Sequence, residues 1–553
     1  MRASSAYPKA ENFAGTFDYV IVGAGSAGCV LANRLSADPR NRVALIEAGG
    51  RDNWIWFHIP AGYLFAIGNP RADWMFRTEP DPGLNGRSLA YPRGKVVGGC
   101  SAINAMIYMR GQSADYDHWR QLGLTGWGWR DVLPYFKKAQ NHFAGESEFH
   151  GAGGEWRVDE PRVSWHILDR FAAAARETGI PLTEDFNRGD NEGCGYFQVN
   201  QKAGRRLSAA HAFVKPALKR PNLKLFTGTL VENIVFEGRR ATGLRLKQNG
   251  AETTIAADRE VILCAGAVAT PVILERSGIG DGERLRALAI PVLHHLPGVG
   301  ENLQDHLQLR LIFKISGART MNADYRSAWK RLGMALEYAL RRRGPLTMAP
   351  SQLGAFTRSS PEYATPNLQF HIQPLSLDKF GDPLHEFPAF TASVSNLRPL
   401  SHGSIHARSR DPADHPVIVT NYLSAPEDKR VAVDAIRLTR RIAAAPALAP
   451  YRPEEFRPGA HLVSDAELLH AAGEIGTTIF HPVGTARMGS DSDALAVTDE
   501  CLRVRRIDGL RIVDASVMPR ITSGNTAAPT MMIAEKAADL IVGDLQPSQN
   551  LTA

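Results

Sequence analysis

Three glycines and one glutamate near the start of the sequence have the spacing of a dinucleotide-binding site. Gly23, Gly25 and Gly28 form a G-x-G-x-x-G pattern. The first glycine allows a tight turn, the second lets backbone approach a pyrophosphate, and the third lets a helix pack on a strand. Glu47 follows Gly28 by 19 residues. A carboxylate there can accept hydrogen bonds from ribose hydroxyls and repels a 2′-phosphate, so FAD or NAD is favoured over NADP.

The elements around this pattern are those that such a site requires. Residues 17–22 form a β-branched and aromatic run that predicts a buried strand, and residues 43–46 predict a second one. Between them, residues 29–36 have the apolar spacing of a helix. A second fingerprint, which flavoenzymes reduced by nicotinamide often carry, is absent, because residues 298–303 lack the third glycine.

The rest of the chain predicts a second kind of sheet. Buried strands are predicted at 260–266 and 511–515, and a helix at 527–542. Between residues 307 and 462, alternating stretches such as 367–372 predict a mostly antiparallel sheet with flanking helices.

Length and composition limit the classes of function. At about 150 residues per domain, 553 residues give a prior of three to four units. The net charge of +7 is spread without a long basic block, so no nucleic-acid partner is predicted. The five cysteines form no Cys-x-x-Cys pair, which excludes a cysteine zinc site and is typical of a reducing compartment. No His, Asp or Glu cluster has metal-ligand spacing, so no metal is predicted.

One segment raises the question of membrane contact. Residues 53–70 contain no Asp, Glu, Lys or Arg, but Pro60 and Gly62 interrupt them, so a spanning helix is not expected. A loop that lines a pocket is the main interpretation, and its aromatic residues leave room for contact with a membrane surface. We expect a cytoplasmic protein, with peripheral contact at the inner membrane face left open and no prediction of oligomeric state.

Further motifs give the chain a family resemblance. It resembles the glucose–methanol–choline (GMC) oxidoreductase family, and the motifs span nearly the whole sequence. Besides the N-terminal fingerprint, the segments that carry this resemblance are residues 94–104, 266–280, 297–306, 481–489, 514–519 and 524–530.

The resemblance implies FAD as the cofactor. Some members of the family attach the flavin through a histidine at the position of Ile103. Isoleucine cannot form that bond, so non-covalent FAD is implied. The cofactor-binding residues that the resemblance implies are Gly23, Gly25, Gly28, Glu47, Gly98, Gly99, Asn104, Ala105, Val231, Asp514, Ala515 and Thr526.

The resemblance also assigns two catalytic residues, His481 and Asn525. Alcohol oxidation removes a hydroxyl proton and transfers a hydride from the same carbon to the flavin N5, while the protein supplies a base. Histidine is mostly neutral at pH 7 and suits that task. Asparagine can bind the substrate oxygen and stabilise developing alkoxide character. The two residues lie 44 positions apart, so only the fold can bring them together.

The implied fold has two interleaved parts. One is an α/β FAD-binding Rossmann-like domain of GMC type, and the other is an α+β substrate domain that contains a mostly antiparallel sheet. We expect the FAD domain to comprise residues 15–155, 203–306 and 464–545, and the substrate domain residues 156–202 and 307–463.

The implied function is oxidation of a primary alcohol to an aldehyde. An NAD-dependent dehydrogenase would leave most of the motifs without a role. The pair of His481 and Asn525 favours alcohol chemistry over a lyase or a light-driven decarboxylase, and a non-catalytic flavin-binding protein would not need an intact base and its partner. A non-redox lyase or a flavin-binding protein is kept as a remote alternative. Choline dehydrogenase proper and an oxygen-using alcohol oxidase remain open alternatives.

The substrate and the electron acceptor are less defined. Gln352 falls near the position of a glutamate that helps hold the cation in choline-directed members, and a neutral amide cannot balance that charge. The expectation that choline is the substrate is therefore weakened, and a medium-chain aliphatic or aromatic alcohol is favoured instead. The acceptor is quinone-like or oxygen, and the likeness to bacterial choline-dehydrogenase-like members favours a dehydrogenase.

Overall fold

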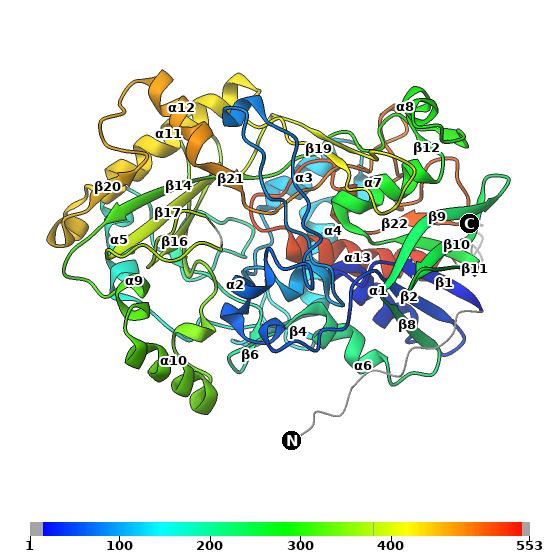
Figure 1. The fold of residues 1–553 in the computed structure, drawn as a ribbon, viewed down its shortest axis with the longest axis horizontal. Coiled ribbons are helices and arrows are strands. Elements are labelled where there is room, and N and C mark those ends of the chain that lie inside the picture. The colour runs from blue at the N-terminus through cyan, green and yellow to red at the C-terminus, as the bar shows by residue number, and fades with distance from the viewer. Residues whose placement is uncertain (1–14, 380, 545–553) are drawn as a thin grey trace, which may run out of the picture.

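Two seven-stranded sheets organise the computed structural model, which describes residues 15–379 and 381–544. Figure 1 shows the sheet of β1, β2 and β8–β11 on the right and the sheet of β14, β16 and β17 on the left. Each sheet has a large hydrophobic core of its own. The mixed α/β fold class and the antiparallel second sheet are confirmed.

The first sheet is parallel on one side and antiparallel on the other. The strands β8, β2, β1, β11 and β22 run parallel, and β11, β10 and β9 form an antiparallel meander. The strand order is β8 (Leu223–Thr227), β2 (Val43–Glu47), β1 (Thr16–Val22), β11 (Ala251–Leu263), β10 (Arg240–Gln248) and β9 (Thr229–Glu237), with β22 (Leu510–Ile512) beside β11.

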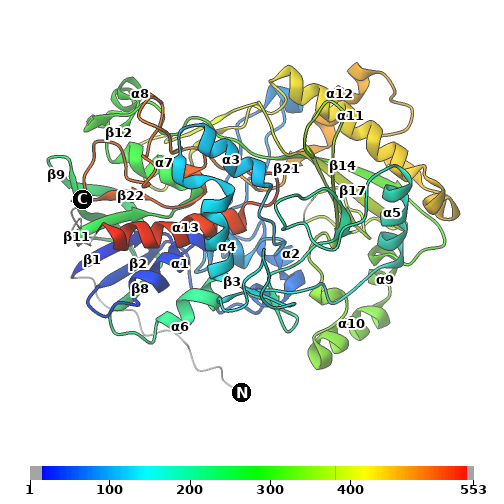
Figure 2. The same ribbon diagram turned by 180° about the vertical axis from the view of Figure 1, so that it is seen from behind.

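Helices cover the parallel strands, which explains their nearly continuous apolar sequences. The helix α1 (Ser26–Leu35) packs on β1 and β2 and against α13 (Ala527–Gly543), which also contacts α4 (Trp129–Ala139). Figure 2 shows α13 in front of this sheet, with α4 beside it toward the middle of the molecule. The strands predicted at 17–22 and 43–46 and the helix predicted at 527–542 are thus confirmed.

The second sheet is antiparallel throughout and has two unlike faces. Side chains alternate between the faces of a strand. In β14, Leu309 and Leu311 belong to the apolar core, whereas Gln308 and Arg310 lie on the opposite face. The strand order is β20 (Glu454–Arg457), β14 (Leu307–Lys314), β17 (Ala389–Asn396), β16 (Leu368–Gln373), β15 (Leu353–Thr357) and β5 (Gly193–Tyr196), with β21 (Gly476–Thr478) beside β14.

Helices cover the apolar face of the second sheet and leave the polar face toward the first. The helix α11 (Pro426–Ala443) contacts β14, β17, α5 (His166–Glu177) and α12 (Asp465–Ile475). The remaining helices are α2 (Tyr63–Ala66), α3 (Ser113–Gln121), α6 (Lys215–Ala217), α7 (Gly266–Arg276), α8 (Gly282–Ala287), α9 (Met321–Tyr325) and α10 (Ala328–Arg341). Within the described ranges, no helix is both long and apolar enough to cross a membrane.

Short strands complete the fold. They are β3 (Gln140–His142), β4 (Trp156–Val158), β6 (Gln201–Lys202), β7 (Arg205–Arg206), β12 (Ile279–Gly280), β13 (His294–His295), β18 (Ser404–His406) and β19 (Val417–Val419).

The chain passes between the two sheets several times. The strand β21 lies within the expected FAD segment 464–545, yet it pairs with β14 of the second sheet. The domain boundaries stay a prediction, and residue 545 lies outside the described residues.

Candidate active site

A cavity of about 570 Å³ lies between the carboxyl ends of the first sheet and the polar face of the second. This volume is within the usual range for ligand sites, roughly 300–1,000 Å³. Gly23 and Glu47 line it from the first sheet, and His371 and Gln308 line it from the second. The crevice beyond the carboxyl ends of parallel strands is where open α/β sheets bind ligands.

The glycine turn brings backbone rather than side chains to the cavity. Gly23 has a φ of +97°, and a Cβ there would lie 2.6 Å from the Cys264 carbonyl oxygen. A Cβ on Gly28 would lie 1.9 Å from the Gly23 carbonyl oxygen, so only glycine lets α1 pack this close. Gly25 and Ser26, at the start of α1, line the cavity. The helix therefore offers its N-terminal N–H groups to a phosphate.

Glu47 ends β2 at the edge of the cavity. Its two carboxylate oxygens accept hydrogen bonds from the N–H groups of Ala24, at 2.9 Å, and Gly49, at 2.7 Å. Burial raises the pKa of Glu47 to about 7, although both N–H bonds oppose the shift. A buried carboxyl group held by backbone beside a glycine turn fits the ribose of a dinucleotide.

A second glycine-containing turn closes on the first. Gly98, with a φ of +102°, donates its N–H to the Ala24 carbonyl at 2.7 Å. A Cβ on Gly99 would lie 2.6 Å from the Gly25 Cα. Gly28 and Gly98 shape these turns without lining the cavity. The other ten predicted cofactor residues line it: Gly23, Gly25, Glu47, Gly99, Asn104, Ala105, Val231, Asp514, Ala515 and Thr526.

Asn104 is held in one orientation by a buried arginine. The Asn104 Oδ1 accepts hydrogen bonds from the Met106 N–H, at 2.9 Å, and from the Arg206 Nη1, at 3.0 Å. Arg206 is 3% exposed and also donates to the carbonyls of Ser101 and Pro60. Burial lowers the pKa of Arg206 to about 9. Sequence reasoning missed this residue, since nothing in its neighbourhood in the chain marks it.

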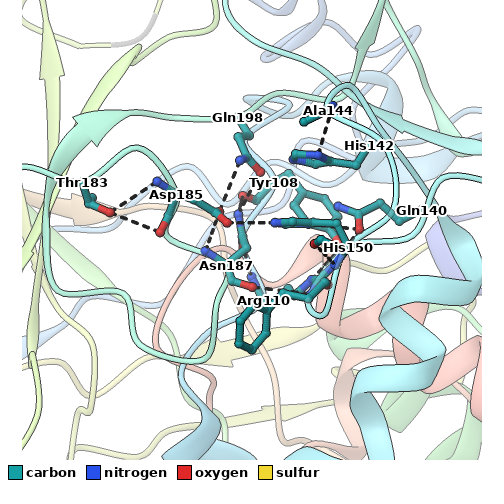
Figure 3. Close-up of polar contacts among 12 residues, drawn as sticks. Tyr108, Arg110, Gln140, His142, Ala144, His150, Thr183, Asp185, Asn187 and Gln198 are labelled. Carbon is teal, nitrogen blue, oxygen red and sulfur yellow. Dashed lines mark hydrogen bonds and ion pairs between the residues drawn. The ribbon is translucent and has the colours of Figure 1, made fainter.

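A second buried arginine braces the strand-like segment that follows Asn104 (Figure 3). The Arg110 Nε donates to the Tyr108 hydroxyl at 3.0 Å, and its Nη2 donates to the Gln140 Oε1 at 2.7 Å. His150 contacts the same Gln140 oxygen and lies 2.8 Å from an Asp185 carboxylate oxygen. This network joins the segment after Asn104 to the strand β3, which holds Gln140, and to the loops that hold His150 and Asp185.

His481 and Asn525 meet in the cavity. The Asn525 Nδ2 lies 3.1 Å from the His481 Nε2, and the Asn525 Oδ1 accepts from the Gln369 Nε2 at 3.2 Å. The other ring nitrogen, His481 Nδ1, lies 3.0 Å from the His306 Nδ1, and the His306 Nε2 lies 3.1 Å from the Leu397 carbonyl oxygen. His306 links the candidate base to the backbone directly after β17, which ends at Asn396.

Burial and neighbouring imidazoles keep His481 neutral. Burial is the largest cause, and the rings of His306 and His371 add to it, so that the pKa of His481 is held well below its usual value. The backbone is fixed as well, because the His481 N–H donates to an Asp305 carboxylate oxygen at 2.8 Å. The other Asp305 oxygen accepts from the hydroxyls of Tyr91, Tyr422 and Thr478.

Comparisons with known proteins agree with this geometry. Two family models, both described as GMC oxidoreductase, match residues 17–308 and 399–534. The chain belongs to the GMC oxidoreductase family. GMC oxidoreductases are FAD-binding flavoproteins, and the two glycine turns and the buried Glu47 fit that cofactor.

Relatives are similar over almost the whole length of this GMC chain. It is 42% identical to human "Choline dehydrogenase, mitochondrial", over 95% of this chain and 90% of that protein. It is also 42% identical to "Alcohol dehydrogenase [acceptor]" of Pseudomonas putida, over 95% of this chain and 96% of that protein. Among solved structures, pyridoxine 4-oxidase from Mesorbium loti superposes with a TM-score of 0.87 at 32% identity, over 95% of this chain and 99% of that one.

One expectation for the GMC substrate site was wrong. Gln352 does not line the cavity, and its Nε2 donates to the Val163 carbonyl at 2.8 Å. Ser351 and Gln373 line the cavity instead, joined by a 3.1 Å hydrogen bond. His371, which also lines it, was not predicted. Burial lowers the pKa of His371 to about 3.

The structure also brings together three possible metal ligands that are distant from one another in the sequence. Ligand atoms of Asp52, His58 and His211 lie within 4.8 Å of one another. The Lys215 Nζ lies 3.0 Å from Asp52 and 2.9 Å from His211, so an ammonium group already supplies the positive charge there. The residues are spread over 160 positions, which is why no metal-ligand spacing is visible in the sequence.

Proposed function

We propose that this GMC oxidoreductase oxidises a neutral primary alcohol to the aldehyde, with non-covalently held FAD, His481 as base and Asn525 as the partner of the substrate oxygen. The observation that carries this is the meeting of the His481 Nε2 and the Asn525 Nδ2 at 3.1 Å in the cavity. Oxidation of an alcohol to a carbonyl requires a base that accepts the hydroxyl proton and a donor that hydrogen-bonds to the oxygen as it becomes negative. The His481 Nε2 and the Asn525 Nδ2 are such a pair.

The protein's part in the reaction is to bind, orient and deprotonate. Bound FAD supplies the redox chemistry. The His481 Nε2 takes the hydroxyl proton, while the Asn525 Nδ2 donates to the alcohol oxygen as negative charge develops on it. The Gln369 Nε2 donates to the Asn525 Oδ1, so the amide keeps its nitrogen toward the substrate.

The charges around the cavity favour a neutral substrate over choline. Its lining carboxyl groups are Glu47, Asp414 and Asp514, and none of them hydrogen-bonds to His481 or Asn525. Near Tyr63, which lines the cavity, the buried charged neighbours are Arg206 and Arg310. Because guanidinium groups repel a quaternary ammonium, we propose a medium-chain aliphatic or aromatic alcohol.

Choline remains the second candidate, because the similarity to choline dehydrogenases extends over nearly the whole chain. For the electron acceptor, we propose a quinone-like molecule before oxygen. We also propose a cytoplasmic protein with peripheral contact at the inner membrane face, which the exposed side chains of Ile55, Leu64 and Phe65 support.

Anaerobic reduction of the bound flavin tests the function directly. Hexanol or benzyl alcohol should bleach the yellow protein, and His481→Ala should slow bleaching by about 10²–10⁴-fold while keeping its FAD. Preferred bleaching by choline would replace the neutral-alcohol proposal, and normal bleaching in His481→Ala would refute the base. Rapid mixing of the reduced enzyme with oxygen or a soluble quinone separates oxidase from dehydrogenase.

A further inference from the structure

The helix α10 exposes a row of large apolar side chains to solvent. Trp329, Leu332, Leu336 and Leu340 are 83%, 50%, 52% and 81% exposed. Their spacings of three and four residues place them on one face of the helix. Met334 and Tyr338, on the opposite face, are buried against the protein. Figures 1 and 2 show α10 protruding from the lower edge of the molecule.

Basic residues flank this apolar row. Between residues 326 and 343 there are six arginines and lysines and one acid, Glu337. Arg341, Arg342 and Arg343 follow the row at its C-terminal end, and all three are exposed. At the other end, the Arg331 guanidinium lies 5.4 Å from the ring centre of Tyr325.

We propose that α10 is a membrane-docking helix that lies flat in the headgroup region of a bilayer rich in anionic phospholipid. A helix with tryptophan and leucine on one face and arginine and lysine beside them is typical of that location. The charge beside the apolar row indicates which partner binds the exposed face of α10. Anionic headgroups complement the basic flanks, whereas the same face of a second copy would bring like charges together.

The docking surface continues toward residues that line the cavity. The turn η7 (Pro345–Thr347) contacts both α10 and η2 (Pro60–Gly62), which leads into α2. In α2, Leu64 and Phe65 are 47% and 48% exposed, while Tyr63 lines the cavity. This inference rests on the proposed function for its purpose: docking would bring the cavity close to the bilayer, in which apolar alcohols and quinones dissolve.

Vesicle flotation of the full FAD-loaded chain tests the proposal. We expect the protein to float with vesicles of phosphatidylcholine and phosphatidylglycerol, and to float far less with phosphatidylcholine alone. The double variant Trp329→Ser and Leu340→Ser should weaken binding at least about tenfold, because both apolar side chains leave the bilayer. Arg341→Gln with Arg343→Gln should weaken it by about fivefold for each guanidinium removed.

A matched control variant distinguishes binding through α10 from binding through any exposed apolar side chain. Val463 and Leu400 are 66% and 53% exposed outside α10, and Val463→Ser with Leu400→Ser should leave binding unchanged. The proposal would be overturned if the protein did not bind anionic vesicles, or if the control variant lost as much vesicle binding as the α10 variants. Self-association that the α10 variants abolish would overturn it as well. Alcohol-dependent reduction of a water-soluble dye should be unchanged in these variants, and it reports on the proposed function separately.

Discussion

His306 and His481 face each other through their Nδ1 atoms, 3.0 Å apart, and this contact fixes which nitrogen of His481 is the base. The His306 Nε2 lies beside the Leu397 carbonyl, which can only accept, so the His306 Nε2 carries the proton. The His306 Nδ1 is then an acceptor, and the His481 Nδ1 must donate to it. The His481 Nε2 is left unprotonated, with its electron pair directed at the Asn525 Nδ2 in the cavity.

Replacing His306 should therefore lower the rate without emptying the cofactor site. In His306→Asn, the amide oxygen can take the place of the Nδ1 acceptor. His306→Leu has no acceptor, so it should lose a larger part of the roughly 10²–10⁴-fold contribution of the base. Since the His306 ring lowers the pKa of His481, its loss should move the acid limb of kcat/KM to higher pH.

The two substitutions distinguish a positioning role from a packing role. Equal kcat for His306→Asn and His306→Leu, at equal FAD content, would count against the tautomer argument. An acid limb that stays in place in both variants would count against the effect of the His306 ring on the pKa of His481. Stopped-flow flavin reduction across pH gives both quantities.

Asn525→Ala should lower kcat more than it raises KM. Removing a single donor that acts on a developing oxyanion typically costs about 10²–10³-fold in kcat. Gln369→Ala, which removes only the N–H donor to the Asn525 Oδ1, should cost less because the Asn525 Nδ2 remains. Steady-state kinetics with one alcohol compares them, and a larger loss in Gln369→Ala would contradict the assignment.

Glu47 should make the FAD-free protein less stable as pH rises. Its pKa is about 7 when folded against an ordinary value of 4.5. Between these values the folded state binds the extra proton, so the free energy of unfolding falls with rising pH. At 1.36 kcal/mol per pKa unit, the effect is on the order of 3 kcal/mol. Denaturant unfolding at about pH 5 and about pH 8 should show this drop, and Glu47→Gln should remove it.

Gly28→Ala should damage the cofactor site, whereas Gly50→Ala should not. The new Cβ at position 28 would lie 1.9 Å from the Gly23 carbonyl oxygen, and at position 50 no atom lies within 4 Å. Overpacking of this kind typically costs about 1–3 kcal/mol. The ratio of flavin to protein absorbance and the Tm measure the outcome, and equal FAD content in the two variants would contradict the steric argument.

Local patterns predicted the first glycine turn of the cofactor site and Glu47, whereas the cofactor residues from Gly98 onward were implied by the family resemblance. The strand, glycine turn and helix that hold Gly23 and Gly28 are adjacent in the chain, so their spacing alone predicts their geometry. The substrate half depends on strand register. A shift of one residue turns a side chain to the other face of a sheet, which is how Ser351, not Gln352, comes to line the cavity.

Contacts between distant strands were invisible in the sequence. His371 reaches the cavity because β16 pairs with β17, which in turn pairs with β14. The exposure of Trp329 and Leu340 could not be predicted either, because apolar residues at helical spacing usually indicate a buried face. Only the packing of Met334 and Tyr338 shows which face of α10 is covered.

The order of strands in the first sheet also sets when that sheet can be completed during synthesis. The strand β1 pairs with β11, and β11 pairs with β22, which ends only 41 residues before the last residue of the chain. At roughly 5–20 residues per second, translation from β1 to β22 takes about 25–100 s. The first sheet cannot be complete until β22 has been synthesised, so a nascent chain that already holds the whole N-terminal fingerprint still has unpaired strands beside it.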